Sequence, residues 1–184
     1  MKLYYILFFL SIGVFAQETP AETFWNQLQQ HCGKSYAGTI TKGMGNDDFD
    51  GKKLLMHVRS CEENEIKIPF FVGENKSRTW ILRLKDDKIE LKHDHRQPDG
   101  SEDEITQYGG TSSNTGLAKL QVFPADEETA ELIPAAATNV WSISLDDKIF
   151  SYNLKRIGSE TNFRVEFDLS KPVKTPDAPW GWEE

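Results

Sequence analysis

The sequence predicts a mainly β protein: an antiparallel up-and-down β-barrel of about eight to ten strands, preceded by one helix. Hydrophobic and polar residues alternate with a period of two over most of the chain. Runs rich in branched and aromatic residues are separated by Gly, Asp and Asn. So many consecutive antiparallel strands either close into a barrel or divide into a β-sandwich, which is the alternative fold.

The length and charge of the chain restrict both its organisation and its partners. Its 184 residues suit one domain, and 27% of them are charged, with 29 acidic against 21 basic residues. The net charge of −8 argues against a nucleic-acid partner, because binding to phosphates needs a basic surface.

Residues 1–16 are typical of a cleavable export signal. Lys2 precedes an apolar run, and the small residues Val14 and Ala16 stand at the positions that signal peptidases recognise. The apolar run is shorter than the roughly 20 residues that cross a bilayer. We therefore expect cleavage after Ala16, a single domain over residues 17–184, a secreted or periplasmic location and no integral membrane segment.

Export also suggests the state of the two cysteines, Cys32 and Cys61. In an oxidising compartment an even pair most simply forms one disulfide. A catalytic thiol or metal pair would need a CxxC spacing or further ligands, which the sequence lacks. The predicted disulfide joins the end of the first helix to the second strand.

The first element after residue 16 is predicted to be an amphipathic helix over residues 20–31. Thr19 is a plausible N-cap with Glu22 three residues later, and Pro20 occupies the tolerated first position. Gly33 ends the helix. Its apolar face consists of Phe24, Trp25 and Leu28.

Period-two runs predict strands over residues 35–41, 53–61, 65–72, 78–85, 88–95, 105–110, 119–123, 138–145, 148–156 and 163–169. The pairs Asp86-Asp87 and Asp146-Asp147 predict tight hairpins, because Asp tolerates left-handed backbone conformations. After the last strand, prolines break regular pairing, and we expect the tail to wrap the surface. Trp180 and Trp182 could stack on a sugar or a partner, but packing over one end of the barrel is favoured.

Two resemblances extend this prediction. A helix containing Trp25 followed by Gly33-Lys34-Ser35-Tyr36 resembles the start of lipocalins and calycins, although their usual Gly-x-Trp is absent, and it implies a barrel. The segments 56–61, 74–82, 91–110 and 163–169 resemble a group of uncharacterised secreted proteins of Gram-negative bacteria. The second resemblance implies a bacterial secreted protein and brings no activity with it.

His93 and His95 are the most informative polar residues. On a strand over residues 88–95 they share a face with Ile89 and Leu91, which is the face expected to point inward. They could ligate a metal or haem iron, one could act as a general base beside a carboxylate, or both could anchor a ligand. Alternatively, the strand ends near His93 and the pair lies at a solvated rim.

The favoured hypothesis is a barrel that binds a small, partly apolar molecule through His93, His95, Arg59, Arg78 and Tyr108. The alternatives are a metal- or haem-dependent enzyme or sensor built on the two histidines, and an interaction protein without a pocket. The sequence identifies no cofactor. The common local signatures of nucleophilic, zinc-hydrolase and nucleotide chemistry are absent from it, which favours a binding protein over an enzyme.

Overall fold

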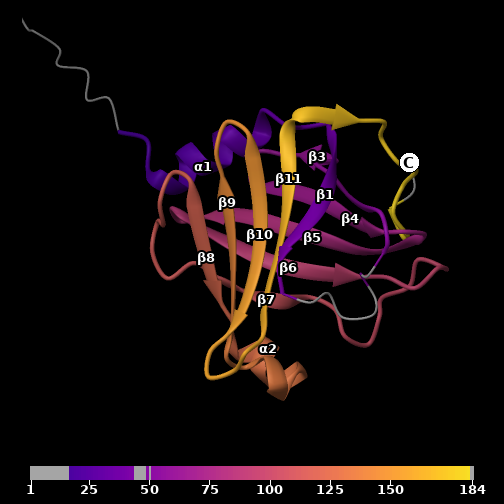
Figure 1. Ribbon diagram of the computed structural model, residues 1–184. Coiled ribbons are helices and arrows are strands. Elements are labelled where there is room, and N and C mark those ends of the chain that lie inside the picture. Colours follow the sequence, from indigo (N-terminus) through magenta and orange to yellow (C-terminus); the bar gives the residue numbers. More distant parts are fainter. Residues whose placement is uncertain (1–16, 44–48, 50, 183–184) are drawn as a thin grey trace, which may run out of the picture.

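The structure is a computed structural model, and it describes residues 17–43, 49 and 51–182. The predicted signal peptide, residues 1–16, lies outside this described part. Within it, one nearly closed antiparallel sheet curves into a barrel, with α1 (Pro20–Gln29) near one end and α2 (Glu127–Leu132) near the other (Figure 1). The predicted fold class is therefore confirmed, and the sandwich alternative is wrong.

Eleven strands form the sheet. They are β1 (Ser35–Lys42), β2 (Leu54–His57), β3 (Ser60–Cys61), β4 (Glu65–Val72), β5 (Asn75–Lys85), β6 (Lys88–His95), β7 (Tyr108–Thr111), β8 (Leu120–Pro124), β9 (Asn139–Leu145), β10 (Ile149–Arg156) and β11 (Asn162–Val173). A short 3-10 helix, η1 (Pro134–Ala136), follows α2. The count exceeds the prediction because the single strand expected over residues 53–61 is two short strands, β2 and β3, which both pair with β4.

The strand order follows the chain, as an up-and-down barrel requires. Neighbouring strands follow the order β7-β6-β5-β4-β2-β1-β11-β10-β9-β8, in which the first strand, β1, pairs with the last strand, β11. The remaining seam lies between β7 and β8. There the backbone N–H of Asp126 donates to the carbonyl of Gly109 at 3.1 Å. A Cβ on Gly110 would lie 1.8 Å from the carbonyl oxygen of Pro124, so only glycine permits this close approach.

Local signals place the first helix and the hairpins. The hydroxyl of Thr19 accepts from the backbone N–H of Glu22, whose carboxylate accepts from the N–H of Thr19, which completes the predicted capping box. Asp86 and Asp87 have positive φ angles of 48° and 57° in the turn between β5 and β6. The carboxylate of Asp146 accepts from two backbone N–H groups in the turn before β10. Both predicted hairpins are confirmed.

Apolar side chains of α1 and of the inner sheet face form one continuous core. Trp25 of α1 also donates from its indole N–H to the carbonyl of Glu63, 3.1 Å away, which fixes the helix against the barrel. Further along the interior, Trp80 of β5 lies between Phe70 and Tyr152, with ring centroids 4.9 Å and 4.5 Å from its own. This three-ring stack crosses from β4 to β10 and lines the cavity described below.

The predicted disulfide is present. Cys32, just after α1, is bonded to Cys61 in β3, and their Cα atoms are 6.1 Å apart. Its presence is weakly consistent with an oxidising location, such as the periplasm or the extracellular space.

The C-terminal tail, residues 174–182, lies on the surface as expected, but its Trp182 packs on the outer wall of the barrel and not over one end. The indole N–H of Trp182 donates to Asp94 at 3.2 Å. The cationic groups of Lys67 and Arg96 lie 4.5 Å and 5.3 Å from the centroid of the same ring. Because Asp94 faces outward from β6, the tail covers the outside of the strand whose inner face carries the two histidines.

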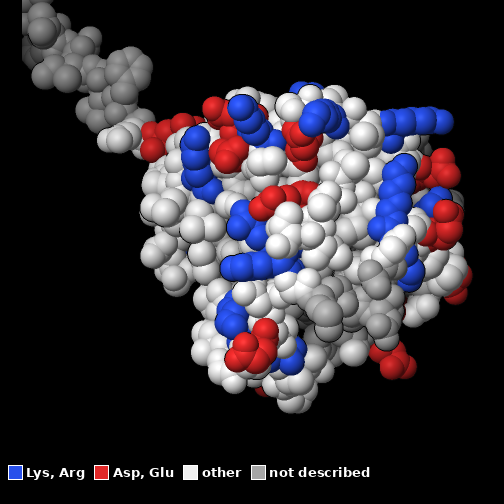
Figure 2. All heavy atoms as spheres, viewed as in Figure 1, with Lys and Arg blue, Asp and Glu red and all other residues white. Residues whose placement is uncertain are grey.

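Charged side chains of both signs are interspersed on the face shown in Figure 2. Across the described residues, no helix combines the length and apolar character needed to span a lipid bilayer.

Candidate functional site

The alternation of β6 points His93 and His95 into the barrel, as the sequence predicted. In the sheet, His93 is opposite Trp80 of β5 on one side and Tyr108 of β7 on the other, and His95 is opposite Arg78. Strand β6 continues to His95, so the strand does not end at His93. The side chain of His93 is buried, with 4% exposed, and that of His95 is half-buried.

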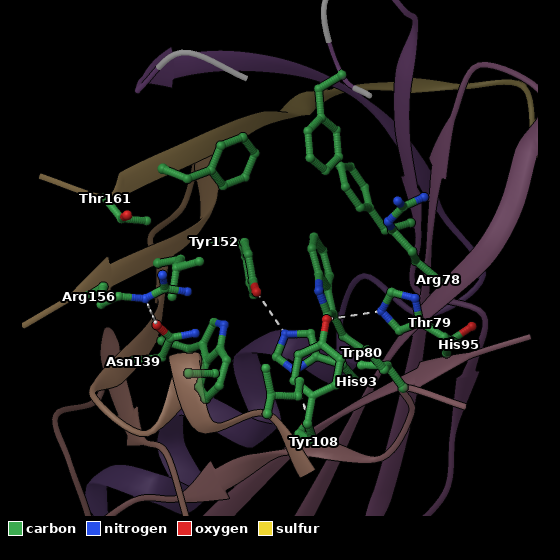
Figure 3. A pocket seen from close by; sticks show the side chains of 18 residues that line it. Arg78, Thr79, Trp80, His93, His95, Tyr108, Asn139, Tyr152, Arg156 and Thr161 are labelled. Carbon is green, nitrogen blue, oxygen red and sulfur yellow. Dashed lines mark hydrogen bonds between the residues drawn. The ribbon is translucent and has the colours of Figure 1, made fainter. Parts of the chain in front are cut away.

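Both ring nitrogens of His93 make hydrogen bonds. Nδ1 lies 3.0 Å from the carbonyl oxygen of Tyr108 and must donate to it, because a carbonyl oxygen only accepts. Nε2 of the neutral ring therefore accepts from the hydroxyl of Tyr152 at 2.7 Å (Figure 3). Burial lowers the pKa of His93 to about 3, so the ring is neutral at pH 7.

His95 and Tyr108 form a second polar pair beside the first. Nε2 of His95 lies 3.1 Å from the hydroxyl of Tyr108 (Figure 3). Burial, together with the charge of Arg78, lowers the pKa of His95 to about 4. Burial raises the pKa of Tyr108 to about 12. Both groups are uncharged at pH 7, so they act as hydrogen-bonding groups that carry no net charge.

These pairs face a cavity of about 460 Å³. Its volume lies in the range typical of pockets for small organic ligands, and its walls are mainly aromatic and aliphatic, with a few polar groups. Figure 3 shows these side chains projecting into the cavity from opposite walls of the barrel. The lining residues are Phe49, Phe70, Arg78, Thr79, Trp80, His93, His95, Ile105, Tyr108, Ile133, Ala136, Asn139, Trp141, Tyr152, Leu154, Arg156, Thr161 and Phe163.

Four of the five predicted ligand-binding residues meet in this cavity: His93, His95, Arg78 and Tyr108. Arg59 is not among the described residues that line it. Arg59 lies between β2 and β3, close to His57. The pKa of His57 is lowered mainly by burial and, to a smaller extent, by the charge of Arg59. The prediction grouped Arg59 with the others by residue type, and nothing in its local pattern placed it on the inner face.

The prediction missed the wall formed by β9 and β10. Asn139 and Trp141 of β9 pair with Arg156 and Leu154 of β10, and all four line the cavity. A signal for β10 was present, because Phe150, Tyr152, Leu154 and Arg156 follow each other at period two. Their proximity to His93 depends on closure of the barrel, which local sequence does not specify.

The site offers little for metal binding. Across residues 17–43, 49 and 51–182, no three or more His, Cys, Asp or Glu side chains are grouped so that they could hold a metal ion. In addition, a metal could bind His93 only if one of its two hydrogen bonds were broken. The described residues therefore provide no ready-made site of three or more protein ligands for the predicted metal alternative.

Comparison of the chain with protein-family models, with curated proteins and with solved structures finds no match. Functional inference for this chain therefore rests on the geometry and chemistry of the cavity itself.

Proposed function

We propose that this protein is an exported barrel that binds one small, partly apolar molecule in the cavity beside His93 and His95. The observation that supports this most directly is the cavity itself, about 460 Å³ in volume, with aromatic walls and a few converging polar groups. Tyr108 and Arg78 complete the polar side of the proposed site. Arg59 is left out of it because of its position between β2 and β3.

The chemistry of the lining favours binding over turnover. His93 and His95 have pKa values well below neutrality, and burial raises the pKa values of Tyr108 and Tyr152. None of these groups is close to the pKa that a general acid or base needs near pH 7. A cavity of this size also argues against the alternative of an interaction protein without a pocket.

Export is part of the proposal, and it is supported by the signal-like residues 1–16 and by the disulfide. Mass spectrometry of protein secreted by a bacterial host checks it. Mature protein that begins at Gln17 is the expected result, and protein retained in the cytoplasm with residues 1–16 attached would contradict it.

The binding proposal is tested with the uncharged fluorescent probe N-phenylnaphthylamine. Saturable binding at one site is expected, and Leu154→Phe should weaken it at least about tenfold, because the larger ring occupies the cavity. Leu117→Phe is the matched control, since Leu117 is 63% exposed and lies outside the lining. Absence of saturable binding, or equal affinity in the wild type and the Leu154→Phe variant, would refute the proposal.

A further inference from the structure

The lining of the cavity is positively charged, although the protein as a whole is negatively charged. Among the described residues that line it are two arginines, Arg78 and Arg156, and no aspartate or glutamate. The two histidines add no charge at pH 7, for the reasons given above. The chain has a net charge of −8. The cavity thus differs from the rest of the molecule in the sign of its charge, which favours an anion inside it.

Arg156 is the arginine best placed to hold an acid group. It ends β10 opposite Asn139 of β9, and its Nε donates to the amide oxygen of Asn139 at 2.9 Å (Figure 3). Asn139 is itself buried, with 5% exposed, so this bond fixes the plane of the guanidinium. Within the described chain, Nη1 and Nη2 of Arg156 make no hydrogen bond or ion pair. This pair of nitrogens matches the geometry of two oxygens of one carboxylate or sulfonate.

Arg78 is more fully engaged by the protein. Its Nη1 donates to the side chain of Asn75 at 3.0 Å, and its guanidinium carbon lies 5.4 Å from the ring centroid of Phe49. Its charge adds to the positive potential near His95 and Tyr108. It assists burial in lowering the pKa of His95, and it opposes the larger effect of burial, which raises the pKa of Tyr108. We therefore expect the charge of Arg78 to attract an anion into the cavity, without direct hydrogen bonds from Arg78 to its acid group.

Apolar side chains line the same cavity as Arg156. Leu154 precedes it on the inner face of β10, Trp141 is opposite Leu154 on β9, and both line the cavity. Phe163 and Tyr152 line it as well, with ring centroids 6.5 Å apart. A bound molecule can therefore place an acid group on Arg156 while its apolar body contacts these rings.

We infer that the cavity selects an organic acid, with its acid group held by Arg156 and its aromatic or aliphatic body packed against Trp141, Leu154 and Phe163. This inference rests on the proposed function, because it requires that the cavity binds a small molecule. It adds the chemical class of that molecule and the residue that recognises it.

Two probes that differ by one acid group test the inference. Anilinonaphthalenesulfonate and N-phenylnaphthylamine share the same aromatic rings, and only the first carries a sulfonate. In the wild type we expect the sulfonate to bind about tenfold more tightly than the neutral probe, since a charged hydrogen bond is only partly screened at a half-buried site. Arg156→Gln should remove that advantage, so that the two probes bind with similar affinity.

Arg59→Gln is the matched control, because it removes the same charge from the protein outside the cavity lining. Saturable binding of the neutral probe by Arg156→Gln also shows that this variant retains a folded cavity. Equal affinity for the two probes in the wild type, or loss of the sulfonate advantage in Arg59→Gln as much as in Arg156→Gln, would overturn the inference while the proposed function stands. If the tighter binding of the sulfonate probe were lost only in Arg78→Gln, the assignment of the acid group to Arg156 would be overturned. Failure of both probes to bind would refute the proposed function itself.

Discussion

The hydroxyl of Tyr152 on β10 donates a hydrogen bond to Nε2 of His93 on β6, and the two atoms lie 2.7 Å apart. These strands do not pair in the sheet, so the bond crosses the interior of the barrel. It links the wall that carries the predicted histidines to the wall that sequence reasoning missed.

Removal of this donor is expected to destabilise the fold. Tyr152→Phe leaves Nε2 of His93 buried without a partner, and we expect the free energy of unfolding to fall by about 1–3 kcal/mol. Urea unfolding followed by tryptophan fluorescence measures it. Tyr36→Phe serves as control, because the Tyr36 hydroxyl bonds to Nδ1 of the half-buried His31, and its loss should cost less. An equal or smaller effect at Tyr152 than at Tyr36 would contradict this role.

The free energy of unfolding should decrease as the pH is lowered through the range where histidines titrate. The unfolded chain binds a proton at His93 below about pH 6.5, whereas the folded chain binds it only below about pH 3. The contribution of neutral His93 to the free energy of unfolding is therefore fully present above about pH 6.5. It decreases by about 1.4 kcal/mol per pH unit as the pH falls toward 3. His95, with its pKa lowered to about 4, adds a contribution of the same sign.

Urea unfolding at several pH values between about 6.5 and 4.5 measures this slope, since most carboxylates titrate lower. His93→Asn is expected to have a smaller slope than the wild type, and His95→Asn gives an independent measurement at a half-buried position. Slopes identical to that of the wild type in both variants would show that the buried histidines do not control the pH dependence.

The disulfide should contribute substantially to stability. Cys32 and Cys61 are separated by 29 positions in the chain, and closing a loop of this size is worth about 3–4 kcal/mol in the chain-entropy model. Addition of dithiothreitol should lower the urea midpoint of the wild type by the corresponding amount. The double variant Cys32→Ser, Cys61→Ser should match the reduced wild type and show no response to reductant. A response in the double variant would contradict this interpretation.

The contacts of Trp182 predict a stabilising tail that is independent of ligand binding. Trp182→Ala removes the hydrogen bond to Asp94 and the contacts with Lys67 and Arg96, and we expect a loss of about 1–3 kcal/mol. Binding of N-phenylnaphthylamine should not change, because the tail lies on the outer wall. Trp182→Phe keeps an aromatic ring but lacks the N–H group. Its stability should lie between those of the wild type and of Trp182→Ala. Weaker probe binding in Trp182→Ala would instead connect the tail to the cavity.

The sequence was sufficient to predict those elements that depend on neighbouring residues. The paired aspartates place the turn between β5 and β6, and period-two alternation sets the bounds of β4 and β6 correctly. It also places His93 and His95 on the inner face, because alternation within a strand is a local property. The capping box identifies the start of α1 for the same reason.

Contacts between residues far apart in the chain could not be predicted in this way. Trp182 docks on Lys67, Asp94 and Arg96, which come together only once β4 and β6 lie in one sheet. Arg59 and Arg156 are chemically identical, yet only Arg156 occupies an inward position of a strand. The period-two pattern of β10 contained that information, whereas the segment around Arg59 is interrupted between β2 and β3.

Strand β6 is covered on both sides. Its inner face carries His93 and His95, while outside it Lys92 forms ion pairs with Asp126 and Glu128, at 2.7 Å and 2.9 Å, and Asp94 is sealed beneath the tail. Barrel strands with a solvated outer face tolerate random substitution at every second position. In β6 no residue from 91 to 94 has that freedom, so a mutagenesis library selected for folding should be depleted at four consecutive codons there and at alternate codons in β9.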